Sequence, residues 1–327
     1  MNDIAGSIPA LILIGAVGIP AAVYLFLGLG ERILSRFGAS EARGLRPWVW
    51  LLIPLTLIGL ILLYPLGTTL VLAFGDATSA NWVGLANFVW AFTGDMVEVL
   101  GNNLIWLIVF PLITLVLAMI VAVLFDRVKY ERFAMTIVIL PTAISFTAGS
   151  IIWRQLFSYQ PEGTAVRGTL NALWTLIPGN KPVPWLQTSF VNTFALILVA
   201  VWAALGVAAL ILSAAIKNVP AELVEASKLD GAGELRIFWS ITLPNIFPAV
   251  LVVVTTEVIF ALKIFDIIYV MTNGNFGTDT IANRMYHELF AANNLGHASA
   301  IAALLLIVAL PVVILNIRQF RAEEGSR

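Results

Sequence analysis

Residues 218–244 read NVPAELVEASKLDGAGELRIFWSITLP, a segment with six charged residues between two long apolar runs. Asn218 can cap a first helix there. Its opening turn would contain Pro220 and Glu222. The missing N–H of the proline and the negative charge of the glutamate both suit the start of a helix. Gly231 then supplies a residue that tolerates the left-handed conformation, which predicts that the first helix stops there.

The second half of this segment predicts another short helix. It begins at Gly233 or Glu234 and runs to about Thr242, and Pro244 ends it before the next apolar run. We therefore expect a compact two-helix elbow. Its surface is more apolar than a solvated linker needs, which suits either docking into another protein or lying at the membrane interface. The apolar residues are Leu223, Val224, Leu229, Leu235, Ile237, Phe238 and Trp239.

Outward from the elbow, the chain consists of apolar runs long enough to cross a hydrocarbon core of about 30 Å. Six uncharged runs cover residues 8–30, 48–74, 104–125, 133–153, 190–216 and 298–317. A seventh, 248–271, contains Glu257, Lys263 and Asp266 but is otherwise strongly apolar. Each run should be a helix, because a lipid-exposed backbone must pair its own N–H and C=O groups. The sequence predicts an all-α membrane protein with seven transmembrane helices.

Composition agrees with a membrane protein and excludes several functional classes. The 327 residues are 60% hydrophobic and 11% charged, whereas about a quarter of a soluble domain is charged. The net charge of −1 offers no overall field to attract nucleic acid. The chain has no cysteine, which excludes disulfides and thiolate chemistry. No phosphate-binding GxxxxGK[ST] or hydrolytic HExxH or GxSxG sequence occurs, so we predict a protein that is not an enzyme and binds no cofactor or metal.

Basic residues are distributed unequally between alternate connections. One set comprises Arg32, Arg36, Arg43, Arg46, Arg127, Lys129, Arg132, Lys217, Lys228, Arg236, Arg318, Arg321 and Arg327. The other set comprises only Arg154, Arg167, Lys181 and Arg284. Because cytoplasmic loops carry the excess of Lys and Arg, we expect the elbow and the C-terminus in the cytoplasm and the N-terminus outside.

The spacing of the elbow resembles the EAA loop found in the membrane subunits of bacterial ABC importers. The matching residues are Glu225, Ala226, Ser227, Gly231, Ile241, Leu243 and Pro244. Ser227 replaces the usual third alanine by another small residue. In that family the elbow sits in a cleft of the ATP-hydrolysing subunit, which binds the ATP and Mg²⁺. The resemblance therefore assigns ATPase coupling to Glu225, Ala226, Ser227, Asp230 and Gly231.

The resemblance also implies a domain organisation, a substrate class and partners. Residues 1–46 would form an additional N-terminal helix and linker, and 47–327 a six-helix permease core with the coupling loop 217–247. The sequences at 139–153 and 265–274, with Tyr286 and Phe290, resemble maltose-type carbohydrate importers. The segment TNGNFGTDTIAN at 272–283 is most similar to α-glucoside permeases. Expected partners are a second permease subunit, an ATPase dimer, a periplasmic or lipid-anchored sugar-binding protein and the sugar itself, in the bacterial inner membrane. A large external domain is absent from the sequence.

The charges inside the run 248–271 suggest a polar path. Each ionisable residue costs about 2.5–3.5 kcal/mol near the bilayer centre. On a continuous helix Lys263 and Asp266 would lie close enough to pair, with Thr256 on the same face and Glu257 opposite. A structural ion pair and an ion-coupled secondary transporter that uses the three charges are the alternatives. The predicted path residues are Ser145, Thr147, Thr256, Glu257, Lys263, Asp266 and Tyr269.

Overall fold

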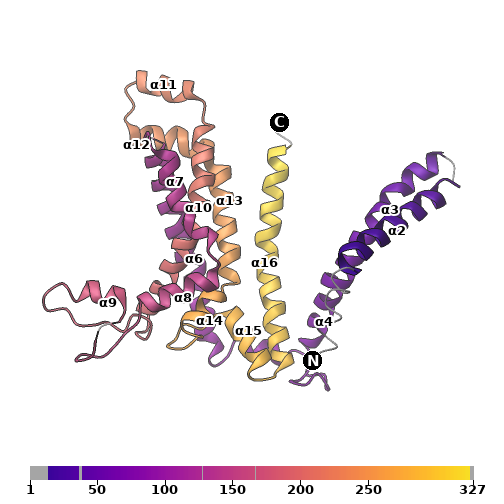
Figure 1. Ribbon diagram of the computed structural model, residues 1–327, viewed down its shortest axis with the longest axis horizontal. Coiled ribbons are helices and arrows are strands. Elements are labelled where there is room, and N and C mark those ends of the chain that lie inside the picture. Colours follow the sequence, from indigo (N-terminus) through magenta and orange to yellow (C-terminus); the bar gives the residue numbers. More distant parts are fainter. Residues whose placement is uncertain (1–13, 37–38, 127, 166, 325–327) are drawn as a thin grey trace. The chain divides into compact units, whose positions relative to one another are not determined.

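The computed structural model describes residues 14–36, 39–126, 128–165 and 167–324. Within these ranges every regular element is a helix (Figure 1). The chain divides into two compact units, Met1–Thr69 and Leu70–Arg327. Six of the described helices are long and apolar enough to cross a membrane, and a sharply bent pair supplies a seventh candidate. The predicted all-α membrane fold is confirmed.

The described part of the first unit consists of two helices and the start of a third. A π-helical turn, Ile14–Gly18, leads into α2 (Ile19–Leu34), and α3 (Ala39–Ile58) continues through a π-helical turn, Gly59–Leu63, into α4 (Tyr64–Leu72). The part of the predicted span 8–30 that precedes residue 14 lies outside the described residues. Gly30 allows α2 and α3 to approach, because a Cβ there would clash with Cγ1 of Val49. Arg46 also pairs with Glu31 at 2.9 Å between the two helices.

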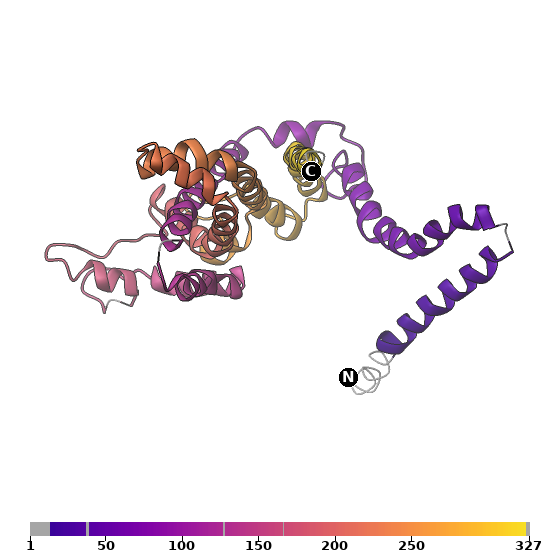
Figure 2. The same cartoon turned by 90° about the horizontal axis from the view of Figure 1, so that it is seen from above.

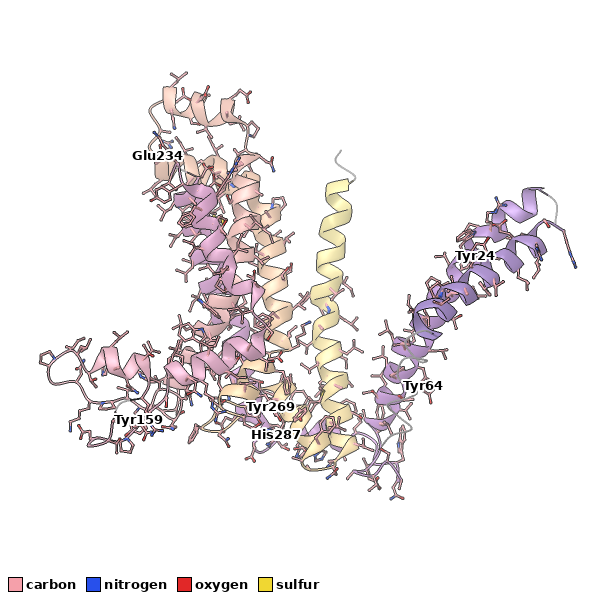
Figure 3. The ribbon with its side chains drawn as sticks, viewed as in Figure 1. Tyr24, Tyr64, Tyr159, Glu234, Tyr269 and His287 are labelled. Carbon is pink, nitrogen blue, oxygen red and sulfur yellow. The ribbon has the colours of Figure 1, made fainter. Side chains whose placement is uncertain are left out.

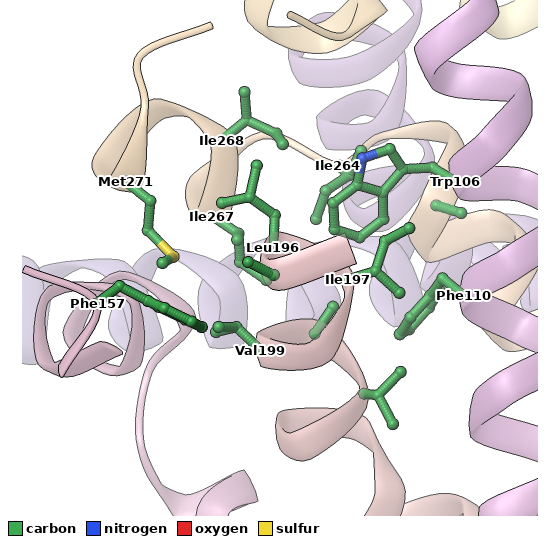
Figure 4. Close-up of a cluster of buried hydrophobic side chains, with 14 residues drawn as sticks. Trp106, Phe110, Phe157, Leu196, Ile197, Val199, Ile264, Ile267, Ile268 and Met271 are labelled. Atoms are coloured by element: carbon green, nitrogen blue, oxygen red, sulfur yellow. The ribbon is translucent and has the colours of Figure 1, made fainter. Parts of the chain in front are cut away.

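The centre of the second unit is a bundle of three long helices, α6 (Met96–Phe125), α10 (Val191–Lys217) and α13 (Leu243–Leu262). They lie side by side when the molecule is seen from above (Figure 2). At one end of the bundle Trp106, Phe110, Leu196 and Ile267 are fully buried (Figure 4). At the elbow end the buried residues include Ala118, Ala122, Ala208 and Ala209. Small side chains let helix backbones pack closely, which is the main source of helix association in lipid.

Further helices pack around this bundle. The helix α16 (Leu295–Glu324) packs against α13, and α15 (Ile281–Phe290) packs against α16. The short helix α9 (Thr169–Trp174) lies in a connection at the end of the bundle away from the elbow (Figure 1). At the same end α5 (Ala86–Trp90) packs against the start of α16. We call this end the outer end, after the side of the membrane that the distribution of basic residues predicts for it.

The predicted continuous span 133–153 is wrong. It consists of α7 (Glu131–Ile139), a 3₁₀ turn (Leu140–Ala143) and α8 (Phe146–Leu156), with a bend of 98° between the two halves. Pro141 has no N–H to continue the helix. Ser145 is extended at ψ 147°, and its Oγ accepts a hydrogen bond from Ala148 N at 3.2 Å. A serine N-cap inside the apolar run therefore starts a new helix.

The elbow and the following span also depart from the prediction at Pro244. The helix α12 (Glu234–Ile237) continues through a π-helical turn (Phe238–Thr242) into α13, so that one rod extends over Glu234–Leu262. In the wide turn Leu243 N–H bonds to Phe238 O, five residues earlier. Asn245 Nδ2 also donates to Ile241 O at 2.7 Å. The π-turn accommodates the proline that was expected to end the helix.

At its other end α13 stops at Leu262, in the middle of the predicted span 248–271, and α14 (Asp266–Met271) begins after a break. Phe265 there has φ −135° and ψ −60°, which no helix can contain. Groups from other elements satisfy the freed carbonyls. Thr280 Oγ1 donates to Ile264 O at 3.0 Å, and Asn103 Nδ2 lies 3.4 Å from Ala261 O. Tertiary contacts therefore replace the hydrogen bonds that a continuous helix would make.

Three asparagines from the long helices hold the outer segment 272–281. Asn102 Nδ2 donates to Gly277 O and Asp279 O, each at 2.9 Å, and Asn192 Nδ2 donates to Phe276 O at 2.8 Å. Asn103 Oδ1 accepts from Ile281 N at 2.8 Å. All three asparagines are buried. They therefore anchor an irregular loop to α6 and α10 at the outer end.

Candidate functional site

The elbow is formed by α11 (Ala221–Leu229) and α12, joined at Gly231. Gly231 has φ +78°, as the sequence predicts. The turn is a Schellman motif: Ala232 N–H bonds to Ser227 O, and Gly231 N–H bonds to Lys228 O, both at 3.0 Å. These bonds satisfy the last carbonyls of α11 and fix the direction in which the chain enters α12. Figure 1 shows α11 at the extreme end of the second unit, beyond α12.

The first helix of the elbow begins differently from the prediction. Asn218 is the C-cap of α10, with its backbone N–H bonded to Ala215 O and Ile216 O. Pro220 is the N-cap of α11 and has φ −55° and ψ 125°. A proline costs no hydrogen bond at this position, because the first N–H groups of a helix have no partner within it. The side chain of Asn218 is therefore not needed to start α11.

The five predicted coupling residues lie together on this elbow. Glu225, Ala226, Asp230 and Gly231 are exposed, and Ser227 is half-buried. Ser227 Oγ donates to Leu223 O at 2.9 Å, so its hydroxyl is satisfied inside α11 and the residue acts as a small one. Lys228 Nζ lies 3.8 Å from Glu234 Oε1, across the turn.

The elbow exposes large apolar side chains as well. Leu229 is 89% exposed and Leu235 77% exposed, and Trp239 and Leu223 are exposed too. Beneath α11 lies a groove of about 1300 Å³, lined largely by apolar residues from the ends of α6 and α10 and from the start of the rod Glu234–Leu262. Among the lining residues are Met119, Val123, Ile216, Val224, Phe238 and Leu243. Apolar area of this size around charged Glu225 is typical of a surface that contacts another protein.

At the outer end, the second halves of the two broken spans pack against each other. The helix α8 contacts α14, and Arg154 Nη1 donates to Val270 O at 3.3 Å. Thr147 Oγ1 donates to Asp266 Oδ1 at 3.2 Å. Thus two predicted path residues, far apart in sequence, are neighbours. Figure 3 labels Glu234 at the elbow and Tyr269 and His287 at the opposite end.

The remaining path residues are placed as follows. Ser145 and Tyr269 are exposed, Ser145 as the cap of α8 and Tyr269 on α14. Thr256 is exposed, but its hydroxyl donates to Val252 O at 2.8 Å within α13. Glu257 is only 7% exposed, on the same face of α13 as Val253 and Ala261. These positions agree with the expectation that Glu257 points away from Thr256.

The predicted pair of Lys263 and Asp266 does not form. Among the described residues no ion pair or hydrogen bond joins any two of Glu257, Lys263 and Asp266. The helical wheel assumes a continuous helix, whereas α13 ends before Lys263 and α14 starts at Asp266. Lys263 and Asp266 are both exposed. A proton relay through the three charges has no connected path in this arrangement.

A cluster of charged side chains lies in the outer connections. Arg284 lies 3.7 Å from Asp95, 3.8 Å from Asp279 and 3.5 Å from Glu288. Burial raises the pKa of Asp279 above its ordinary value, against the lowering effects of Asn283 and Arg284. His297 stacks on Trp90 with ring centroids 3.6 Å apart, and its Nδ1 lies 3.1 Å from Glu288 Oε2. These contacts join α5, α15 and α16 at the outer end.

Sequence reasoning missed the residues from other elements that stabilise the break between α13 and α14. The side chains of Asn103 and Thr280 donate hydrogen bonds to backbone carbonyls at and just after the end of α13. Neither residue is a predicted site residue. The only signal for Asn103 is its place directly before an apolar run. The aromatic surroundings of Tyr269 were missed as well: its ring lies 5.1 Å from that of Phe265 and 4.9 Å from that of Tyr286.

Comparisons with known proteins agree with this geometry. The family described as binding-protein-dependent transport system inner membrane component matches residues 114–322. The osmoprotective compounds uptake permease protein GgtC of Synechocystis is 47% identical over 81% of this chain and 95% of its own length. The alpha-glucoside transport system permease protein AglF of Rhizobium meliloti is 35% identical, over 89% of each chain.

One solved structure has the same fold over most of its length. It is a chain of a bacterial ABC transporter involved in the import of the acidic polysaccharide alginate. The TM-score is 0.74 at 23% identity, and the match covers 86% of this chain and 98% of that one. The family match extends from α6 into α16 and includes the elbow and both broken spans. The chain belongs to the inner membrane permease components of binding-protein-dependent ABC transport systems.

Proposed function

We propose that this chain is one permease subunit of an ABC importer for α-glucosides or related saccharides. The observation that carries the proposal is the elbow: an exposed two-helix turn with a Schellman stop at Gly231, in the family whose members are transport subunits and not enzymes. The α-glucoside class is supported by the relative named for α-glucoside transport. Family membership gives no support to the ion-coupled alternative.

The partners are those that such a subunit needs. A second, homologous permease completes the path, and an external binding protein delivers the saccharide. An ATPase dimer binds ATP and Mg²⁺, since no phosphate-binding loop occurs in this chain. The elbow faces the cytoplasm, with the N-terminus outside and the C-terminus inside, an orientation that the distribution of basic residues supports.

Coupling then works through rigid elements. The residues Glu225, Ala226, Ser227, Asp230 and Gly231 present the elbow to the ATPase. The second helix of the elbow is continuous with α13, so a displacement of the elbow is passed along one rod as far as Leu262. Beyond that point α14 packs on α8. Movement of the rod would shift this contact between two half-helices and switch access between the two sides of the membrane.

The substrate path would lie along the exposed polar groups of α8, α13 and α14. Its residues are Ser145, Thr147, Thr256, Lys263, Asp266 and Tyr269, which are all exposed. Glu257 is buried in this chain and would adjust the packing of α13 rather than touch the sugar.

The test is reconstitution of the four components in liposomes with ATP inside and radiolabelled maltose, trehalose or sucrose outside. We expect uptake of at least one of these sugars that requires ATP hydrolysis and the binding protein. An imposed proton or sodium gradient without ATP should give none. ATP-independent uptake by the chain alone would refute the proposal, and so would ATP-driven uptake restricted to substrates other than saccharides.

A further inference from the structure

Four aromatic side chains form one cluster between α14 and α15, and we call Phe265, Tyr269, Tyr286 and Phe290 the aromatic platform. The rings of Phe265 and Tyr269 are stacked with centroids 5.1 Å apart. Tyr286 lies 4.9 Å from Tyr269 and 5.2 Å from Phe265. Phe290 follows one turn later on α15, 4.7 Å from Tyr286. The two helices thus bring the rings into a continuous row.

The platform is not a closed core. Phe290 is 64% exposed and Tyr269 38% exposed, so part of the row is free to meet another molecule. The hydroxyls of Tyr269 and Tyr286 lie 3.5 Å apart. This hydrogen bond raises the pKa of Tyr286 above its ordinary value. The platform offers aromatic faces together with hydroxyl groups that can donate or accept.

Charged groups adjoin the platform. Asp266 lies directly after Phe265 and three residues before Tyr269 on α14, so it projects near the same side of the helix. Its carboxylate is exposed and accepts from Thr147, which leaves further lone pairs available. Lys263, in the break before α14, is exposed and has no ion pair among the described residues.

These neighbours decide what kind of molecule fits. A lipid tail or an apolar helix laid on the platform would take the charged groups of Asp266 and Lys263 out of water without giving them a partner, which is unfavourable. Water alone would leave large aromatic surface exposed. A saccharide satisfies both requirements, because a pyranose ring has an apolar C–H face for an aromatic ring and hydroxyls at its edge for a carboxylate.

We propose that the aromatic platform, with Asp266 and Thr147, is a saccharide subsite at the outer end of the transport path. The sugar stacks its apolar face on the rings of Tyr269, Tyr286 and Phe290, and its hydroxyls bond to Asp266. This inference rests on the proposed function as a saccharide importer and adds the residues that first receive the sugar after it leaves the binding protein.

The test compares ring chemistry with hydrophobic packing in the assembled transporter. Phe290→Leu and Tyr286→Leu keep apolar bulk but remove the ring, whereas Phe290→Tyr and Tyr286→Phe keep it. Phe92→Leu is the matched control, since Phe92 is an exposed outer residue without a ring partner among the described residues. Liposomes contain ATP, the binding protein is saturated with radiolabelled maltose, and both maltose uptake and ATP hydrolysis are measured.

We expect each leucine substitution on the platform to lower the maltose transported per ATP by about 2- to 12-fold, the range that a lost aromatic contact implies. The ring-preserving substitutions and Phe92→Leu should stay close to the unaltered transporter. Equal ratios in all variants would overturn the subsite. A variant that loses uptake, ATPase activity and association with the second permease together would also overturn the subsite, because the platform would then be a contact between subunits. If the unaltered transporter moves no saccharide, the proposed function fails, and the subsite with it; if it moves maltose while the leucine variants match the control, only the subsite fails.

Discussion

Replacing Gly231 by alanine is the sharpest test of the elbow. Gly231 has φ +78°, and a Cβ built there meets nothing within 4 Å. The substitution therefore removes no contact and causes no clash. Its whole effect is the strain of placing a side chain in the left-handed region, about 1–2 kcal/mol. That strain works against the Schellman turn that orients α11 relative to α12.

Gly233 provides the matched control in the same turn. It has φ −73° and ψ 160°, which any residue adopts, and it is also surrounded by open space. Gly233→Ala should therefore leave the turn intact. Gly231→Asn should fall between the two, because asparagine tolerates the left-handed region better than alanine does.

The assay is the affinity of the detergent-solubilised permease pair for its ATPase subunit, followed by ATP hydrolysis in liposomes. If the elbow must hold this turn to dock, Gly231→Ala should weaken the association by about 5- to 30-fold, which corresponds to the strain. Membrane insertion and pairing with the second permease should be unchanged. Equal affinity of the Gly231→Ala and Gly233→Ala proteins would refute the reasoning, because the shape of the turn would then be irrelevant to coupling.

Three further predictions concern the two breaks and the bundle. Asn103→Leu should lower stability in detergent by about 1–3 kcal/mol, because it leaves Ile281 N–H unpaired and removes the amide that lies beside Ala261 O and Leu262 O. A thermal melt against Asn218→Leu, at an exposed site, checks it. Gly206→Ala should be destabilising by about 1–3 kcal/mol, since its Cβ would lie 2.5 Å from Val138 O, whereas Gly101→Ala has open space and should not be; the same melt separates them. Thr147→Val and Asp266→Asn should reduce saccharide uptake non-additively, and a double variant as impaired as the product of the single effects would argue that the hydrogen bond is unimportant.

Much of the membrane architecture is predictable because apolar runs of the required length have few alternatives in lipid. The same holds for the turn at Gly231, where the sequence supplies a residue suited to left-handed backbone. Both are local properties. The spacing of Glu225, Gly231 and Pro244 carries the resemblance to the EAA loop, although Pro244 lies within a continuous rod and does not end a helix.

The breaks were not predictable in the same way. The hydropathy pattern of the run 248–271 predicts one span, but the end of α13 depends on Asn103 and Thr280, which are distant in sequence. For the run 133–153 a local signal exists, since Ser145 within an apolar segment can cap a helix. The prediction treats this serine only as a polar group of the path. The prediction that Lys263 pairs with Asp266 is wrong for a related reason, because the helix ends at Leu262 and helical periodicity does not continue beyond it.

The site at the outer end is a tertiary feature. Thr147 and Asp266 are both predicted path residues, but nothing in the sequence places one against the other. The contact arises because both spans are broken and their second halves pack together. The row of aromatic rings likewise needs α14 and α15 in their folded positions, since each helix contributes only part of it.

The most direct test of coupling through the elbow is cysteine cross-linking in the assembled transporter. The chain contains no cysteine, so Leu229→Cys places a single thiol at a highly exposed position of the elbow. We predict that this thiol cross-links to the ATPase subunit and that the yield of the cross-link changes when ATP is added. The thiol should also be inaccessible to impermeant reagents applied from outside intact cells. Labelling from outside, or a cross-link to the external binding protein instead of the ATPase, would contradict the account.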